Sequence, residues 1–509
     1  MVLTLILLLP FLGSFALLLL PRDQRHVLHY TALGISLAPL ALSVLLLFLF
    51  PYGEPGFHCG VIQSWIPSLG IDFRLGLDGM SLVMVVLTAF LTTLSIPASF
   101  SYIHKREKEF YFFLLLLETG MLGTFMALDL FVFYLFWELM LVPMYFIIGV
   151  WGGEKRIYAS IKFFLYTAFG SALLLLVIFY LYFQAGYQLG LAPSFNFENF
   201  TALTLTKTTQ TWLFWGFILA FLIKIPLFPF HTWLPYAHTE APTAGSVILA
   251  GILLKTGVYG ILRFAVPIFP QAVVAFTPWL MALALIGIVY GAMIAMIQRD
   301  VKRLVAYSSV SHMGMILAGI FAWNVQGLQG GIIQMINHGL STGALFLIVG
   351  IIYERRHTRQ IEEFGGLAKV MPVYAAFFMI FTLSSIGLPG LNGFIGEFLI
   401  LVGLMGVSIP WAVIASLGLI LGAAYMLRLY KEMMFGPLTN KANAALPDLN
   451  RREFYILLPI AILCFIIGLY PAPLQKTLEP SVEQIQAYVQ PYLEPSEWKP
   501  FPTDPPKAE

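Results

Sequence analysis

Five charged side chains lie inside long apolar stretches of this sequence. They are Glu118, Glu138, Lys224, Lys255 and Glu397. A charge at the centre of a membrane helix costs about 2.5–3.5 kcal/mol on insertion scales, so such residues usually face a bundle interior or a water-filled path. Carboxylates and amines can both take up and release protons. The five residues therefore predict a series of titratable sites along an ion route.

Lys224 lies in the stretch FLIKIPLFPFHTWLP, and Pro226 and Pro229 follow it within five residues. Because proline cannot donate a backbone hydrogen bond and its ring clashes with the preceding turn, we expect a broken membrane helix here. His231 and His238 follow Lys224 at intervals of seven residues and are candidate site residues. The alternative is that both are interfacial histidines bonded to the backbone. The motif offers no third ligand, so no metal site is predicted.

Lys255 and Glu397 lie in two glycine-rich stretches. Gly251 and Gly257 flank Lys255, and small residues of this kind allow helices to approach closely. Lys255 is either half of a structural ion pair or a lysine that switches between its charged and neutral forms. Glu397 ends the stretch GLPGLNGFIGE, in which glycine recurs every third residue around Pro389. This stretch predicts a second interrupted helix.

Two lone histidines lie in later apolar runs, His312 in SSVSHMGM and His338 in QMINHGLSTGALF. A buried histidine is often a hydrogen-bonded core residue. The alternative is a relay, because histidine titrates near neutral pH and has two ring nitrogens that can pass a proton on. On that interpretation the two histidines connect Lys255 with Glu397. No partner is predicted for Glu118.

The composition is that of a membrane protein. Of the 509 residues, 59% are hydrophobic and 11% are charged, and the mean hydropathy is +0.85. About fourteen runs are long and apolar enough to span a bilayer. Of the 28 Lys and Arg residues, 20 fall in the odd-numbered loops. The positive-inside rule therefore predicts odd loops in the cytoplasm and both termini on the outer side.

The fold class expected is an all-α polytopic membrane protein. Its seventh and twelfth spans are broken, and paired discontinuous helices are typical of transport proteins built from inverted repeats. Because the two breaks are five spans apart, we expect two inverted five-helix repeats, spans 4–8 and spans 9–13. The predicted units are spans 1–3 (residues 1–110), the first repeat (111–266), the second repeat (267–431), and the last span with an exterior C-terminal tail (432–509). That tail is expected to be disordered or to pack on a neighbouring subunit, with one short amphipathic stretch, SVEQIQAYV.

Several chemistries lack their sequence signals. The two cysteines, Cys59 and Cys464, are far apart in sequence and cannot hold an iron–sulfur cluster by themselves. The chain has no GxxxxGK[ST] phosphate loop and no GxGxxG fingerprint. No cofactor is therefore predicted in this chain, and its energy is expected from an ion gradient or from partner subunits. The net charge of +2 gives no reason to expect a nucleic-acid partner.

Several motifs together resemble one family. GLDGMSL (76–82), FWELMLVPMYF (136–146), the stretch 224–260, VKRLVAYSSVSHMG and GLPGLNGFIGEF are similar to the antiporter-like subunits of proton-pumping NADH:quinone oxidoreductase, respiratory complex I. They are most similar to subunit M, the counterpart of mitochondrial subunit 4. One departure is Tyr236, which stands in WLPYAH where the family usually has WLPDAH.

The resemblance implies a role for each matching residue. Glu138 would pair with Lys224, and Lys255 would be the second lysine site. His312 and His338 would bridge from Lys255 to Glu397, the terminal acid.

The resemblance also implies a proton-translocating membrane-arm subunit that carries out no redox chemistry itself. Its partners would be the other membrane and peripheral subunits of complex I, including neighbouring antiporter-like subunits, within the lipid bilayer. The bacterial inner membrane, or an equivalent energy-transducing membrane, would be its location. Open alternatives are a subunit of a multisubunit Na⁺/H⁺ antiporter, a membrane-bound hydrogenase subunit, and a structural anchor whose charges only hold helices together.

Overall fold

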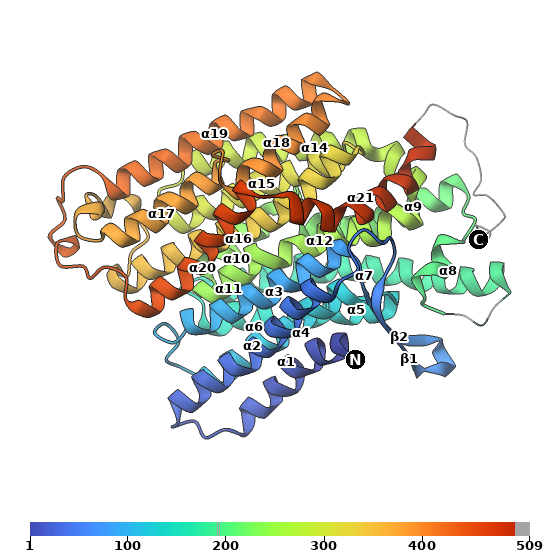
Figure 1. The fold of residues 1–509 in the computed structure, drawn as a ribbon, viewed down its shortest axis with the longest axis horizontal. Coiled ribbons are helices and arrows are strands. Elements are labelled where there is room, and N and C mark those ends of the chain that lie inside the picture. Colours follow the sequence, from blue (N-terminus) through green and yellow to red (C-terminus); the bar gives the residue numbers. More distant parts are fainter. Residues whose placement is uncertain (191, 193, 494–509) are drawn as a thin grey trace.

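The computed structural model describes residues 1–190, 192 and 194–493, and most of them form one bundle of helices (Figure 1). The helices up to the first break are α1 (Val2–Leu19), α2 (Arg25–Leu49), α3 (Gly79–Ala98), α4 (Glu107–Met126), α5 (Leu130–Leu139), α6 (Leu141–Trp151), α7 (Arg156–Leu189), α8 (Phe197–Thr201) and α9 (Lys207–Lys224). The next are α10 (Trp233–Glu240), α11 (Thr243–Ile248), η3 (Leu249–Leu253), α12 (Leu254–Gly260), η4 (Ile261–Ala265) and α13 (Val266–Ile268). The last are α14 (Pro270–Met296), α15 (Val301–Ile320), α16 (Val325–Arg356), α17 (Pro372–Ser385), α18 (Asn392–Met405), α19 (Ile409–Met434), α20 (Arg451–Leu469) and α21 (Ala472–Leu493). Short 3₁₀ turns lie at η1 (Pro67–Leu69), η2 (Phe230–Thr232), η5 (Ile361–Glu363), η6 (Leu367–Lys369) and η7 (Lys441–Asn443).

The helical membrane class is confirmed. Among the described residues, eleven helical segments are long and apolar enough to cross a membrane. The three other expected spans correspond to α9 with α10, to α15, and to α17 with α18. The count of fourteen, the inverted repeats and the four unit boundaries stay predictions.

Both expected helix breaks are present. The first separates the end of α9 at Lys224 from the start of α10 at Trp233, and two prolines fall in the gap. The second separates α17 from α18, and Gly387 and Gly390 there have φ of 71° and 92°. Only glycine adopts this region readily, because it has no Cβ. Each break therefore follows from the backbone chemistry of proline or glycine.

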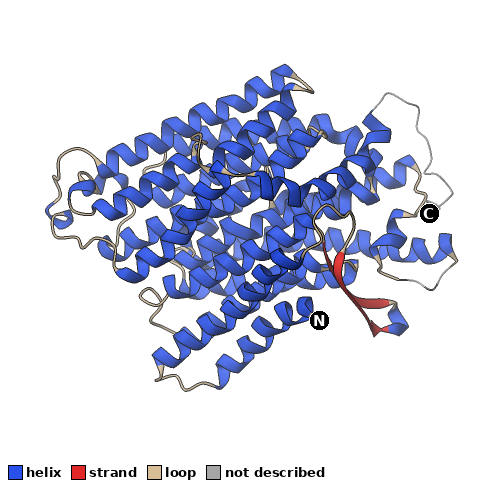
Figure 2. Ribbon diagram, viewed as in Figure 1, coloured by secondary structure: helices blue, strands red, loops and turns tan. Residues whose placement is uncertain are grey.

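A β-hairpin precedes α3, between the second and third predicted spans (Figure 2). Strands β1 (His58–Ile66) and β2 (Ile71–Leu77) pair antiparallel, with His58 opposite Leu77 and Ser64 opposite Asp72. Gly70 closes the turn in the left-handed conformation, at φ of 63°. The hairpin continues directly into Asp78, whose side chain caps α3 by accepting a hydrogen bond from the backbone N–H of Ser81.

The C-terminal segment was expected either to pack on a neighbouring subunit or to be disordered; up to residue 493 disorder is wrong, and packing on a neighbouring subunit stays a prediction. Residues 472–493 form α21, which lies across the bundle and packs on α3, α14 and α16 of the same chain (Figure 1). Leu478, Val482, Ile485 and Val489 are buried at helical spacing on one face of α21. The remainder of the predicted tail lies outside the described residues.

The two ends of the bundle differ. The hairpin and α8 lie at one end, and the loops after α1 and α19 lie at the other (Figure 1). Those two loops are among the cation-rich ones counted for the positive-inside rule, so their common position agrees with the predicted alternation. Which end faces the cytoplasm stays a prediction.

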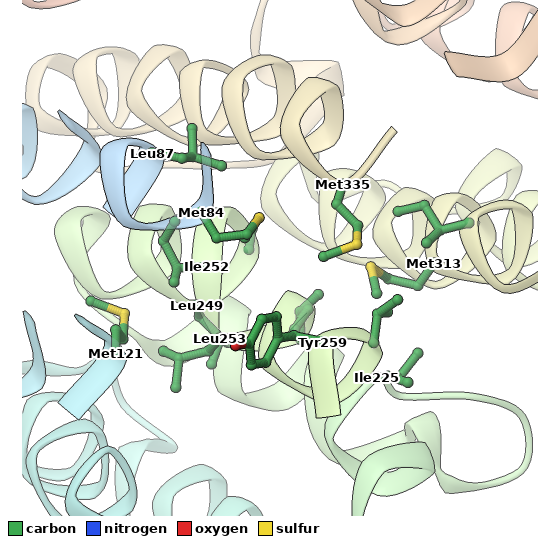
Figure 3. Packing of buried hydrophobic residues seen from close by; sticks show 14 of the residues in the cluster. Met84, Leu87, Met121, Ile225, Leu249, Ile252, Leu253, Tyr259, Met313 and Met335 are labelled. Carbon is green, nitrogen blue, oxygen red and sulfur yellow. The ribbon is translucent and has the colours of Figure 1, made fainter. Parts of the chain in front are cut away.

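The span at the centre of the bundle, residues 243–268, is wholly buried. Two π-helical segments, η3 and η4, flank α12 within it. Figure 3 shows Met84 of α3 beside Ile252 of η3. π-Helical turns within a helix often mark functional sites, because they leave the regular backbone bonding pattern.

Candidate functional site

Lys255 lies on α12 at the centre of the bundle and is fully buried. Its ammonium donates a hydrogen bond to the backbone carbonyl of Ala250, which belongs to the π-helical segment η3. The same Nζ lies 2.7 Å from Nδ1 of His338. The lysine therefore has a direct hydrogen-bond contact with a histidine on another helix, α16.

In space, the titratable groups next after His338 are His312 and then Glu397. The ring centroids of the two histidines are 5.5 Å apart, and Nδ1 of His312 lies 3.6 Å from Oε1 of Glu397. All three side chains are almost wholly buried. Four of the predicted site residues thus form one line through the bundle, from Lys255 on α12 to Glu397 on α18.

Amide side chains that the sequence interpretation missed surround Glu397. Gln334 donates a hydrogen bond from Nε2 to Oε1 of Glu397 at 3.3 Å. Asn337 donates to Oε1 of Gln334 at 3.1 Å and to the carbonyl of Asn392 at 2.7 Å, at the start of α18. A signal existed, because polar residues recur at helical spacing in QMINHGLS. These amides hold Glu397 and the second helix break in one hydrogen-bonded unit.

A small cavity lies beside the end of this line. It has a volume of about 10 Å³, and its lining includes His312, Ser385 and Glu397. The hydroxyl oxygen of Ser385 lies 3.4 Å from Nε2 of His312. A cavity of that volume is at the lower limit for one water molecule, and its polar lining offers such a water hydrogen-bond partners.

Lys224 ends α9 and lies against aromatic rings. Its ammonium lies 5.1 Å from the ring centroid of Trp137 and 5.8 Å from that of Phe163. The Trp137 ring is fixed by a hydrogen bond from Nε1 to the hydroxyl of Ser171, at 3.0 Å. Such a cation–π arrangement favours a charged lysine at a buried position.

Glu138 follows Trp137 on α5 and is close enough to Lys224 to act on it electrostatically. The two do not form a direct ion pair in the described part of the chain. Oε1 of Glu138 is buried and has no hydrogen-bond partner among the described residues. The expected pair is therefore brought to neighbouring helices but is not in contact.

The two histidines after Lys224 occupy different surroundings. His231 packs against Tyr290, with ring centroids 5.1 Å apart, and is not part of the line from Lys255. His238 stacks on Phe346 at 4.5 Å, and neither of its ring nitrogens has a partner in the described structure. Tyr236, which replaces the usual aspartate, lies with its ring centroid 4.5 Å from the ammonium of Lys162.

Lys302 is a further residue that the sequence interpretation missed, because it was grouped with the loop cations. It is buried at the start of α15, and its ammonium donates to the carbonyl of Ala241. Its charge acts electrostatically on His238. A cavity of about 400 Å³ lined by Thr239, Glu240 and other polar residues lies at this end of the bundle. Thr239, which lines this cavity, directly follows His238 in the sequence.

Glu118 on α4 is fully buried, and neither carboxylate oxygen has a partner among the described residues. Across that same part of the chain, no group of three or more His, Cys, Asp or Glu side chains is placed to hold a metal ion.

Two family models match this sequence. Residues 127–424 match the model described as NADH:quinone oxidoreductase/Mrp antiporter, transmembrane. Residues 60–124 match the model of the amino terminus of NADH-ubiquinone oxidoreductase chain 4. The first match includes every predicted site residue except Glu118, and the second includes the hairpin strand β2 and α3.

Individual proteins are similar over nearly the whole chain. NADH-quinone oxidoreductase subunit M of Rickettsia bellii is 44% identical over 467 residues, which cover 91% of this chain and 93% of the relative. A chain of respiratory complex I from Thermus thermophilus with bound NADH superposes with a TM-score of 0.87 at 32% identity, covering 96% of this chain and all of that one. A chain of the Mrp complex from Dietzia sp. DQ12-45-1b has a TM-score of 0.83 at 21% identity, covering 97% of this chain and 99% of that one, a likeness of fold alone. This chain belongs to the family of antiporter-like membrane subunits of NADH:quinone oxidoreductase known as subunit M or chain 4.

Proposed function

We propose that this chain is a proton-translocating membrane-arm subunit of an NADH:quinone oxidoreductase. In this proposal protons pass from Lys255 through His338 and His312 to Glu397. The observation that carries it is the close succession of these four groups: Lys255 contacts His338 at 2.7 Å, the two histidine rings lie 5.5 Å apart between centroids, and His312 lies 3.6 Å from Glu397. A series of titratable groups within a few ångströms of one another is what proton relay requires.

Lys224 and Glu138 control the supply of protons to this line. When the Glu138 carboxylate approaches Lys224, it stabilises the ammonium and the lysine keeps its proton. When Glu138 moves away or is neutralised, the ammonium has only the Trp137 and Phe163 rings as partners, and its proton is released toward Lys255. The open arrangement of Glu138 and Lys224 supports two such states.

The energy comes from outside the chain. Moving one proton against a membrane potential requires about 2.3 kcal/mol per 100 mV. The chain carries no sequence motif for a redox cofactor. Oxidation of NADH by quinone in partner subunits would therefore supply the free energy, through conformational and electrostatic coupling to Glu138.

Glu138→Gln in the assembled complex tests the proposal. The amide keeps the size of the side chain and removes its charge, so NADH-driven acidification of membrane vesicles should be lost while the subunits still assemble. Glu479→Gln removes a charge from an exposed position on α21 and should leave pumping unchanged. Normal pumping by Glu138→Gln, or pumping that depends on sodium rather than protons, contradicts the proposal.

A further inference from the structure

An apolar groove of about 1060 Å³ lies on the side of the bundle between α2 and α20. We call it the α2–α20 groove; its lining includes Leu40 and Phe48 of α2, Val86 of α3, Leu340 of α16 and Leu463 of α20. Lys476 is the one charged side chain that lines it within the described structure. The groove is thus a hydrocarbon surface with a single cation.

Its polar groups gather at one end. Tyr52 follows α2, Tyr470 follows α20, and Lys476 lies in the first turns of α21. Lys476 is exposed, so its ammonium can meet a ligand at the surface. Tyrosine and lysine are typical of the membrane–water interface. The opposite end, at Leu40 and Pro459, is apolar.

The length of the groove matches one leaflet. From Pro459 to Tyr470 its α20 wall extends about 16 Å at the helical rise per residue. The hydrocarbon core of a bilayer is about 30 Å thick, so one leaflet takes up about half of it. A transmembrane helix of a partner would cross both leaflets and present polar residues at two ends. An amphiphile with one polar end fits the groove better.

We propose that the α2–α20 groove binds a phospholipid. An acyl chain lies along the groove, and the anionic phosphate of the headgroup lies at Lys476. The Tyr470 hydroxyl at that end donates a hydrogen bond to a headgroup or glycerol oxygen, whereas the Tyr52 hydroxyl already donates to the backbone carbonyl of Leu47. The apolar lining keeps water away from the acyl chain.

A bound acyl chain would also affect the proton line, the series of groups from Lys255 to Glu397. This part of the inference rests on the proposed function. Ile336 and Leu340 of α16, the helix that carries His338, belong to the lining of the groove. Leu87 lines the groove and also packs against Gly339, where an added Cβ would lie 2.9 Å from Cδ2 of Leu87. One layer of side chains therefore separates the acyl chain from the residue next to His338. The lipid keeps water out of this layer.

Photolabelling of the assembled complex tests the site. The probe is a phosphatidylglycerol with a diazirine near the end of one acyl chain, incorporated into vesicles that contain the complex. We expect labelled peptides from α2, α3 and α20. Val86→Trp, or Leu463→Trp from the opposite wall, fills the groove and should abolish that labelling. Leu165→Trp changes an exposed residue on α7, outside the groove, and should leave it unchanged.

The headgroup contact is tested separately. Lys476→Gln should weaken competition by phosphatidylglycerol by about fivefold, the effect of one lysine at a membrane surface. Competition by zwitterionic phosphatidylcholine should not change. Labelling that survives both tryptophan variants, or a partner-subunit peptide cross-linked in the groove, overturns the proposal. The labelling assay does not depend on proton pumping, so its result stands even if the proposed proton route is wrong.

Discussion

His338 is the residue on which the continuity of the proton line depends. It contacts Lys255 through Nδ1 and faces His312 at a centroid distance of 5.5 Å. His338→Phe keeps an aromatic ring but removes both nitrogens, so protons cannot cross from Lys255 to His312. Proton-transfer groups typically contribute at least about 100-fold to a rate, and NADH-driven vesicle acidification should fall by about that factor.

His231 provides the matched control for this substitution. It is a buried histidine in the same subunit, but it packs on Phe228 and Tyr290 and has no contact with Lys255. His231→Phe should therefore retain most of the acidification rate. Equal loss in both variants would mean that any buried histidine is needed for folding, and the specific line would be wrong.

Charged residues in apolar stretches were predictable one by one, whereas their partners were not. Lys255 and Glu397 stood out because charge inside a membrane run is costly and rare. Lys302 did not, because it lies beside Asp300 at a helix start and only the fold brings the Ala241 carbonyl to its ammonium. Gln334 is uncharged, so its contact with Glu397 depends on how two helices pack.

At the scale of elements, the break between α17 and α18 positions Glu397. A Cβ added at Gly387 would lie 2.2 Å from Oε2 of Glu397, and φ at this glycine is 71°. Gly387→Ala should therefore displace the carboxylate and also strain the backbone by about 1–2 kcal/mol. We expect proton pumping to be lost in vesicles that still contain assembled complex.

A substitution at Gly390 distinguishes backbone strain from displacement of the Glu397 carboxylate. Gly390 also has a positive φ, of 92°, but an added Cβ would meet only a methyl of Leu469 at ordinary distance. Gly390→Ala should lower thermal stability about as much as Gly387→Ala and pump at nearly the normal rate. If both variants pump equally, the break does not position Glu397.

Helix α21 is held on the bundle by a second close approach. A Cβ added at Gly79 would lie 1.8 Å from the carbonyl oxygen of Thr477, and the hydroxyl of Ser481 donates to Oδ2 of Asp78 at 2.8 Å. Gly79→Ala should push α21 away, at a cost of about 1–3 kcal/mol. Limited proteolysis should then cut α21 faster than in the unchanged protein. Gly34→Ala, where an added Cβ meets nothing within 4 Å, should not change the cleavage rate.

The same contact fixes the pH dependence of α21. Burial alone would raise the pKa of Asp78, but the Arg263 guanidinium 2.6 Å away and the bonds from Ser81 and Ser481 hold that pKa below its ordinary value. A lowered folded-state pKa gives stability that is complete above the ordinary pKa and lost as pH falls through the lowered one. Cleavage of α21 should therefore be equal at about pH 5 and about pH 8.

Elements differed in how far the sequence predicted them. The long helices follow from length and hydropathy, and both breaks follow from proline and glycine. The hairpin and α21 depend on contacts with distant parts of the chain, such as that of Ser481 with Asp78. Pro480 and Pro491 also lie inside α21, and proline argues against a helix when only the sequence is considered.

At the scale of the whole molecule, the loop cations predict which end of the bundle faces the cytoplasm. The hairpin and the start of α9 lie at the end of the bundle away from the loop after α1 (Figure 1). Cytoplasmic loops of membrane proteins are rich in Lys and Arg, because these cations resist transfer across the membrane. The loop after α1 carries Arg22 and Arg25, so it should face the cytoplasm and the hairpin should face the other side.

Labelling with a membrane-impermeant maleimide decides the orientation. Native Cys59 on the hairpin is exposed and Cys464 is buried, so only Cys59 should react in unaltered protein. In right-side-out vesicles Cys59 and Thr208→Cys, at the exposed start of α9, should label, whereas Gln24→Cys in the loop after α1 should label only in inverted vesicles. The reverse pattern would place the cation-rich loops outside. The positive-inside rule would then not govern this chain.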